Sequence, residues 1–85
     1  MIIASMIVKV DEEKINDVVL ELQKIPNVTT HGIYKKENII VLVEAESNDQ
    51  LRDLGRFINS TFDGVIGTYP TFVSADEEFE IARAN

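Results

Sequence analysis

The chain has 85 residues, of which 45% are hydrophobic and none is cysteine, and its formal net charge is −7. This length suits one small domain, and so large an apolar fraction disfavours disorder. The lack of cysteine excludes disulfides, thiolate nucleophiles and cysteine-ligated metal centres. The acidic balance disfavours nucleic acid and anionic membranes as partners and favours basic ones, because a negative surface field attracts cations.

The first ten residues, MIIASMIVKV, predict a strand from Ile2 to Val10, because they are apolar and rich in β-branched side chains. Its even-numbered residues are all apolar, whereas the odd-numbered positions include Ser5 and Lys9. We therefore expect the even-numbered side chains to face the core. The segment lacks the basic start of a secretory signal and is too short to span a bilayer, so we expect a cytoplasmic protein.

The following segment predicts a helix that begins after Asp11 and ends before Pro26. Asp11 is a favourable N-cap, and the acidic pair at positions 12 and 13 suits the positive end of the helix dipole. Apolar residues then recur at positions 15, 18, 19 and 22, which is helical spacing. Pro26 disfavours a helical conformation of the residue before it, and so ends the helix.

Two further strands are predicted over Asn27 to Tyr34 and Ile39 to Glu46, joined by a polar connection of hairpin length. The second of these strands is the strongest strand signal in the chain. Its odd-numbered residues are wholly apolar, whereas its even-numbered residues run from Ile40 and Leu42 to two glutamates.

A second helix is predicted to begin at Ser47, which forms a capping box with Gln50. Its buried stripe contains Leu51, Leu54 and Ile58. A turn at Asp63-Gly64 then leads into a last strand over Val65 to Val73. We divide the chain into a domain at residues 1–73 and an acidic C-terminal tail or short helix at residues 74–85.

The predicted order is β-α-β-β-α-β, and the two halves repeat loosely. Two such halves joined by a hairpin are typical of the ferredoxin-like α+β fold. Right-handed crossovers place both helices on one face of a four-stranded antiparallel sheet, with the first and third strands at its centre. We expect no helix of this domain on the other face.

That uncovered face is expected to carry an apolar patch beside charged residues, which is typical of an interaction site. By strand parity, the residues on it or at its rim are Ser5, Ile7, Lys9, Ile40, Leu42, Glu44, Glu46, Ile66, Thr68 and Phe72. Three occupants remain open at this point: a different protein, a second copy of the chain, or the C-terminal segment through Phe79 and Ile81.

The residue types for catalysis are missing from the sequence. His31 is the single histidine, and no nucleophile has the partners that would activate it. No metal-binding spacing occurs, and the acidic loop at residues 11–13 repels phosphate. We therefore predict a binding protein that is not an enzyme and holds no metal or cofactor.

Several segments between Ile3 and Phe72, together with the acidic tail that follows, match one family pattern. They are Ser5-Met6-Ile7-Val8, the isoleucine-containing first helix, Pro26-Asn27-Val28, Ile40-Val41-Leu42-Val43-Glu44-Ala45-Glu46, Gly64-Val65-Ile66 and the acidic tail. In these features the chain resembles the NapD family, cytoplasmic assembly chaperones of periplasmic nitrate reductase. The match covers most of the chain.

The resemblance implies that the chain binds the twin-arginine signal peptide of the reductase catalytic subunit and delays export until the molybdenum cofactor is inserted. The peptide would bind as a helix on the sheet face, with Ile7, Ile40, Leu42, Ile66 and Phe72 as apolar contacts. Glu44 and Glu46 are the candidates for its arginines, and we expect a monomer or weak homodimer. The alternative is a β-α-β-β-α-β module that senses amino acids, which predicts a stable dimer with ligands at the subunit interface.

Overall fold

The computed structural model describes residues 2–75, with side chains described up to residue 71. Its elements are β1 (Ile2–Val10), the 3-10 turn η1 (Glu12–Lys14), α1 (Ile15–Gln23), β2 (Val28–Tyr34), β3 (Asn38–Ala45), α2 (Asn48–Thr61) and β4 (Val65–Ala75). The predicted order of strands and helices is confirmed, and β4 runs two residues further than predicted. The possible helix in the C-terminal tail lies outside the described residues.

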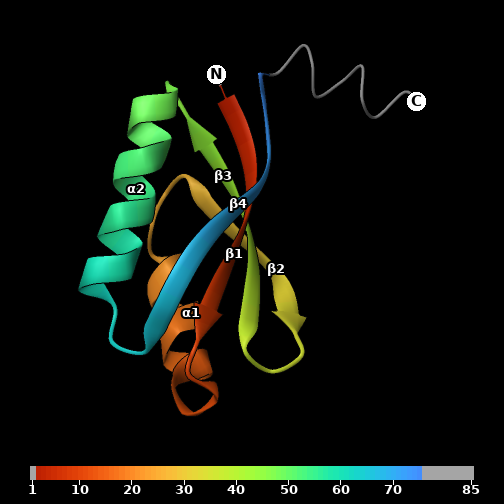
Figure 1. Ribbon diagram of the computed structural model, residues 1–85, viewed down its shortest axis with the longest axis vertical. Coiled ribbons are helices and arrows are strands. Elements are labelled where there is room, and N and C mark those ends of the chain that lie inside the picture. The colour runs from red at the N-terminus through yellow and green to blue at the C-terminus, as the bar shows by residue number, and fades with distance from the viewer. Residues whose placement is uncertain (1, 76–85) are drawn as a thin grey trace.

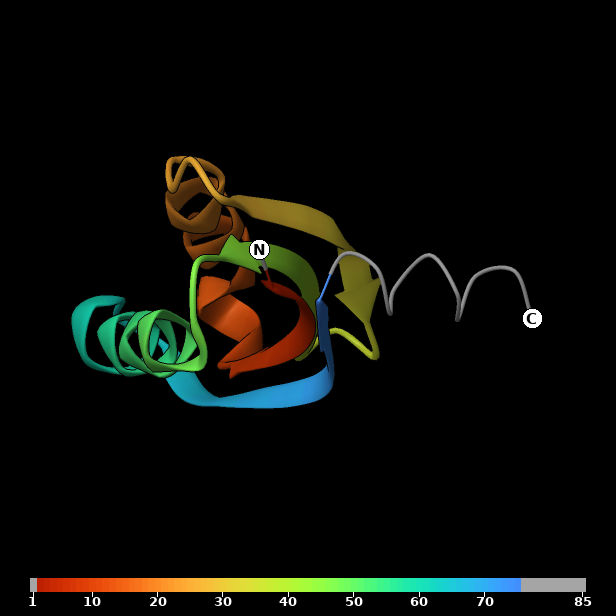
Figure 2. The ribbon, with the colours of Figure 1, turned by 90° about the horizontal axis from the view of Figure 1, so that it is seen from above.

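The four strands form one antiparallel sheet in the order β2-β3-β1-β4. β1 and β3 are therefore the central strands, as the ferredoxin-like fold predicts (Figure 1). Seen from above, the sheet is strongly curved and both helices lie on the same side of it (Figure 2). The fold prediction from the sequence is confirmed.

The core lies between the helices and the face of the sheet that they cover. From Ala4 to Val10, the even-numbered residues of β1 are 2% exposed or less, and so are the odd-numbered residues of β3. Val18 and Leu22 of α1 and Ile58 of α2 close this core from the other side. Burial of each such side chain contributes about 1.5–3 kcal/mol, so these layers hold the strand register.

The helix starts differ slightly from the sequence expectation. Asp11 is a cap as predicted, but its Oδ1 accepts from the Glu13 backbone N–H at 3.1 Å, which closes a tight 3-10 turn before α1 begins. At α2, the Ser47 hydroxyl accepts from the Gln50 N–H at 3.1 Å. The Gln50 side chain in turn accepts from the N–H of Glu46, one residue before the cap.

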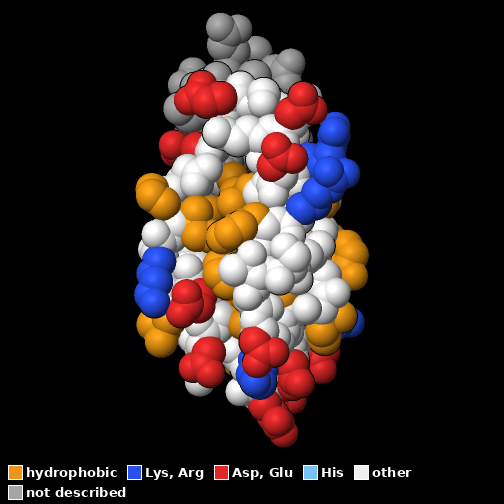
Figure 3. All heavy atoms as spheres, turned by 90° about the vertical axis from the view of Figure 1, so that its left-hand side faces the viewer, with side chains coloured by type: hydrophobic (Ala, Val, Ile, Leu, Met, Phe, Trp, Pro, Cys, Tyr) orange, Lys and Arg blue, Asp and Glu red, His pale blue; other side chains and the backbone are white. Residues whose placement is uncertain are grey.

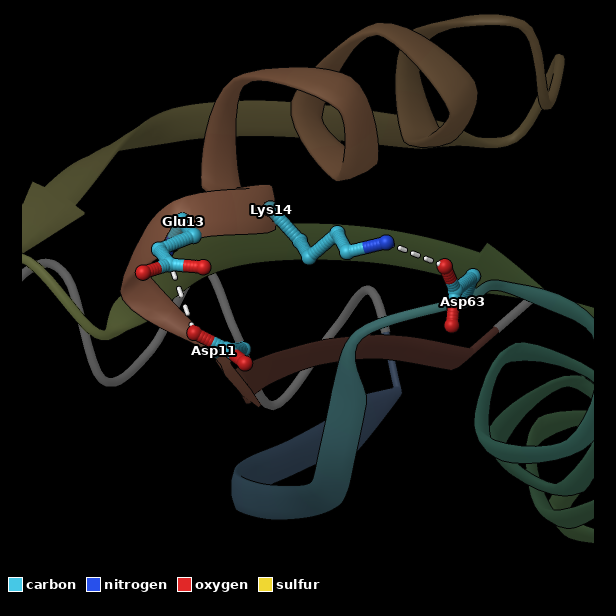
Figure 4. Close-up of polar contacts among 4 residues, drawn as sticks. All are labelled: Asp11, Glu13, Lys14 and Asp63. Atoms are coloured by element: carbon cyan, nitrogen blue, oxygen red, sulfur yellow. Dashed lines mark hydrogen bonds and ion pairs between the residues drawn. The ribbon is translucent and has the colours of Figure 1, made fainter.

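A polar contact ties the start of the first helical segment to the loop after α2. Lys14 Nζ lies 2.5 Å from Asp63 Oδ2. Figure 4 shows the two side chains pointing toward each other. The hydrogen bond and the opposite charge raise the pKa of Lys14 and lower the pKa of Asp63. Gly64 follows with φ +95, and its carbonyl accepts from the Asp11 N–H at 2.8 Å. This loop therefore holds β1, η1 and β4 together.

β4 is an edge strand with two irregularities, one opposite Lys9 and Val10 and one opposite Ser5 and Met6. Pro70 lies beside the second irregularity, in agreement with the rule that proline occupies edge or bulge positions because it donates no ladder hydrogen bond. Each irregularity adds one residue to β4, so side-chain alternation along this strand is interrupted twice.

The side of the molecule that carries the helices is not uniformly polar. Figure 3 shows hydrophobic side chains in its middle and acidic side chains towards both ends. Leu20 of α1 is 60% exposed, and Phe57 of α2 is also exposed. Scattered exposed apolar residues are ordinary on a protein surface.

Candidate functional site

The face of the sheet opposite the helices carries the candidate site. Among residues 2–75, no helix packs on this face, which we call the open face. In the register of β1 with β3, Ile7 pairs with Ile40 and Ser5 with Leu42. These four side chains are half-buried, since they shield one another without being covered by a helix. The prediction that they lie together on this face is confirmed.

Charged side chains end this apolar strip in both directions. Lys9 pairs with Asn38 at the end nearest the β2–β3 turn, and Glu44 pairs with Ile3 at the other end. The backbone of Glu44 is fixed by Asn27, because the Glu44 N–H donates to the Asn27 carbonyl at 3.0 Å and the Asn27 amide donates to the Glu44 carbonyl at 2.7 Å. The Glu44 carboxylate is left exposed.

Glu46 differs from Glu44 in its setting. β3 ends at Ala45, so Glu46 lies beyond the sheet register, in the connection to α2. Its N–H donates to Gln50 Oε1 at 2.6 Å. Glu46 is exposed, but strand alternation does not assign its side chain to the open face.

The expectation that Thr68 lies on the open face is wrong. Thr68 pairs with the buried Val8, and its hydroxyl lies 2.5 Å from Asn59 Oδ1 of α2, so it is on the side of the helices. The physical reason is the extra residue near the start of β4, which shifts the alternation that sequence parity assumes.

Ile66 is that extra residue, because Lys9 pairs with Gly67 and Val10 pairs with Val65. It is 64% exposed and lies opposite Lys9 and Val10, beyond the pair of Tyr69 with Ile7. It lines a hollow of about 640 Å³, which we call the acidic hollow, together with Val10, Asp11, Glu12, Glu13 and Glu37.

β4 instead contributes Tyr69, which the sequence reasoning missed. Tyr69 pairs with Ile7 and is 53% exposed on the open face. Its ring lies over Gly67, in space that a Cβ at that position would occupy. An aromatic side chain over a strand glycine restores packing that the glycine lacks. The backbone of Phe72 pairs with Ser5, in register with the same strip.

β2 adds two further residues at the edge of the open face. Thr29 pairs with Leu42, and Tyr34 pairs with Asn38. The Lys35 ammonium lies 5.3 Å from the centre of the Tyr34 ring, within cation–π range. Gly32, with φ +119, lies in an irregular part of β2, so strand alternation alone does not place Tyr34 on one face.

The described residues do not group into a catalytic or metal site. Within residues 2–75, no three His, Asp or Glu side chains are arranged to hold a metal ion. His31 is exposed on the edge strand β2. In the same part of the chain, no helix is long and apolar enough to cross a membrane. What the open face does present is an apolar strip with Lys9 at one end and Glu44 at the other.

The comparisons with known proteins bear on this site. The NapD protein family model matches residues 1–77. No curated protein matches the chain. The solution structure of the E. coli Tat proofreading chaperone protein NapD is similar, with a TM-score of 0.73 and 22% identity, covering 89% of this chain and 80% of that one.

A crystal structure of a hypothetical protein from Pyrococcus horikoshii is also similar, with a TM-score of 0.64 and 23% identity, covering 88% of this chain and 90% of that one. At these identities the two solved structures support the fold alone. The family model spans nearly the whole chain, including all of the described sheet. The chain belongs to the NapD family.

Proposed function

We propose that this protein is a proofreading chaperone for periplasmic nitrate reductase, which binds the twin-arginine signal peptide of the catalytic subunit in the cytoplasm. Binding delays export until the molybdenum cofactor has been inserted. Membership of the NapD family makes the chain a chaperone and not an enzyme. The name of the similar E. coli protein supports the same role.

The observation that carries the proposal is the open face itself. Ile7, Ile40 and Leu42 present an apolar surface with no described helix over it, and the exposed Glu44 stands at its end. An amphipathic helix binds by laying its apolar side on such a surface. Arginines form strong charge-assisted hydrogen bonds with carboxylates, so a peptide with an apolar stretch and two arginines suits this face.

Tyr69 and Tyr34 extend the same surface on either side. Tyrosine gives a large contact area at low cost in conformational entropy and is enriched at binding sites. Both side chains are exposed, so they are free to close on the flanks of a peptide. Lys9 lies at the end of the strip opposite Glu44, so it marks the other limit of the proposed site.

The direct test is calorimetric titration of the full chain with a synthetic peptide of the reductase signal sequence. We expect one peptide per chain, with an affinity in the micromolar range or tighter that weakens as salt is added. Absence of both a heat signal and NMR shift changes at about 100 μM protein would falsify the proposal.

Two matched leucine variants locate the interaction. Leu42→Asp places a charge in the apolar strip, and we expect it to lower peptide affinity at least tenfold, since the charge loses hydration under the bound helix. Leu20→Asp makes the same substitution at an exposed position of α1, on the other side of the sheet, and should leave the affinity unchanged. Equal effects of the two variants would place binding elsewhere.

The same samples separate the chaperone from an amino-acid sensor. A sensor would be a stable dimer, and its melting temperature would rise with an amino acid and not with the peptide. A chaperone of this kind responds to the peptide alone.

A further inference from the structure

The open face is electrically asymmetric along its length. Of the alternating residues that β1 and β3 place on it, the charged ones are Lys9 and Glu44, at opposite ends. Between them lie the apolar pair of Ile7 with Ile40 and the pair of Ser5 with Leu42. Six residues of β1 separate Lys9 from Ile3, the partner of Glu44, which is about 20 Å at ~3.3 Å per residue. The face therefore has one basic and one acidic end.

A bound helix has polarity of its own. A helix as long as the strip has about 13 residues, at 1.5 Å per residue. Its N-terminus carries a partial positive charge and its C-terminus a partial negative charge. The favourable orientation therefore has the helix N-terminus at Glu44 and its C-terminus at Lys9.

The charges of the peptide favour the same orientation. In export signals the basic residues precede the apolar stretch, so the arginine pair lies on the N-terminal side. An N-terminus at Glu44 brings the arginines to an exposed carboxylate and keeps them about 20 Å from Lys9. The opposite orientation would place the arginines beside an ammonium group.

The chain itself adds acidity at the Glu44 end. Glu46 is exposed just beyond β3. β4 ends at Ala75, which pairs with Ile2 at this same end of the sheet. Four more carboxylates, those of Asp76, Glu77, Glu78 and Glu80, follow β4 in the sequence.

The acidic hollow at the other end is the competing site for the arginines. It is lined by four carboxylates, those of Asp11, Glu12, Glu13 and Glu37. Three lysines offset them: Lys9 precedes the hollow on β1, and Lys35 and Lys36 form the turn before Glu37. One carboxylate oxygen of Asp11 also accepts a hydrogen bond from the Glu13 N–H. Arginines that extend past the strip would have to pass Lys9 to reach the hollow.

We propose that the signal-peptide helix binds in one direction along β1 and β3, with its N-terminus and arginine pair at Glu44 and its C-terminus at Lys9. The two residues act as positioning residues that set the direction. This inference rests on the proposed function, because it concerns the same peptide on the same face.

Paramagnetic labelling of the peptide tests the direction. A nitroxide at the peptide N-terminus should broaden the amide signals of Ile3 and Glu44 in the full-length ¹⁵N-labelled chain, and leave those of Lys9 and Asn38 sharp. A nitroxide at the C-terminus should give the reverse pattern. A bound peptide with the opposite pattern, or with equal broadening at both ends, overturns the inference and leaves the chaperone role standing. A peptide that does not bind overturns the chaperone role.

Matched charge reversals give an independent readout. Glu44→Lys and Glu37→Lys change the net charge equally, one at each end of the sheet. We expect Glu44→Lys to weaken binding by on the order of tenfold, because a charge-assisted contact is lost, and Glu37→Lys to weaken it less than about threefold. A peptide with both arginines replaced by glutamine should lose this difference. A larger effect of Glu37→Lys would assign the arginines to the acidic hollow and overturn the inference.

Discussion

Ile39 and Ile40 are neighbours in β3 and have the same side chain, yet they lie on opposite faces of the sheet. Ile39 is 0% exposed beneath the helices, whereas Ile40 is half-buried on the open face. The same contrast holds for β1, where Val8 is fully buried and Ile7 is not. One strand thus serves the core with one set of residues and the candidate site with the other.

This contrast between the two faces distinguishes two reasons why a strand position is apolar. On the side of the helices, the apolar side chains of β1 and β3 belong to the core, and the fold accounts for their presence. On the open face, a polar residue would suit an antiparallel strand equally well. Under the proposed function, the isoleucines and the leucine there serve to bind the peptide that covers them.

The largest expected effect comes from alanine substitution at these two isoleucines. Ile39→Ala should lower the free energy of unfolding by about 3 kcal/mol, because it leaves a cavity in a packed core. Ile40→Ala should cost about 1 kcal/mol or less, since only part of its surface is buried. Chemical denaturation of both variants measures the difference.

Peptide titration of the same pair gives the complementary readout. Ile40→Ala should weaken peptide binding, whereas Ile39→Ala should leave it nearly unchanged under conditions where the variant is folded. Equal losses of stability would mean that the open face is covered in the free protein, and the contrast between the two faces would then disappear.

The strands that follow a regular period were predictable from the sequence. β1 and β3 alternate without interruption in the register that joins them, so parity placed Ser5, Ile7, Ile40, Leu42 and Glu44 on the open face. The capping roles of Asp11 and Ser47 were also readable, because each side chain accepts from an N–H two or three residues on. Both rules depend on residues that are close together in the chain, so a single sequence is enough to apply them.

β4 was not predictable in the same way, because its two irregularities depend on pairing with β1. The first of them, at Ile66, moves Thr68 to the side of the helices and brings Tyr69 to the open face. Pro70 signals an edge or a bulge, but it does not tell which residue is the extra one. The identity of the peptide is likewise beyond strand parity, and it rests on the family.

A smaller effect on the free energy of unfolding is expected at two glycines with positive φ, one in the loop after α2 and one in the edge strand β2. At Gly64, in the loop between α2 and β4, a Cβ would lie 2.5 Å from Lys14 Cβ. At Gly32, in the edge strand, a Cβ would meet nothing within 4 Å. Gly32→Ala should cost about 1 kcal/mol from backbone strain alone. Gly64→Ala should cost roughly 2 kcal/mol, since the contact with Lys14 adds to that strain. Thermal unfolding of both variants provides the comparison, and equal costs would show that the loop around Lys14 adjusts freely.

The smallest effect concerns the pair of Lys14 and Asp63, which lies outside the strands of the sheet. Their side chains are 43% and 85% exposed, so solvent screens the interaction. The lowered pKa of Asp63 gives stability that is present above pH ~4 and lost as the pH falls through that lowered value. The raised pKa of Lys14 gives stability that is lost only as the pH rises through a value above 10.5.

Asp63→Asn should therefore melt slightly below the parent protein between about pH 4 and pH 10, by less than either glycine variant. The two proteins should converge as the pH falls through the lowered pKa of Asp63, and also in 1 M NaCl, where the Debye length is about 3 Å. Peptide affinity should not change, because Asp63 belongs to the loop between α2 and β4 and not to the open face. A loss of peptide affinity in this variant would mean that the loop between α2 and β4 is coupled to the open face. The two faces of the sheet could then not be treated as independent.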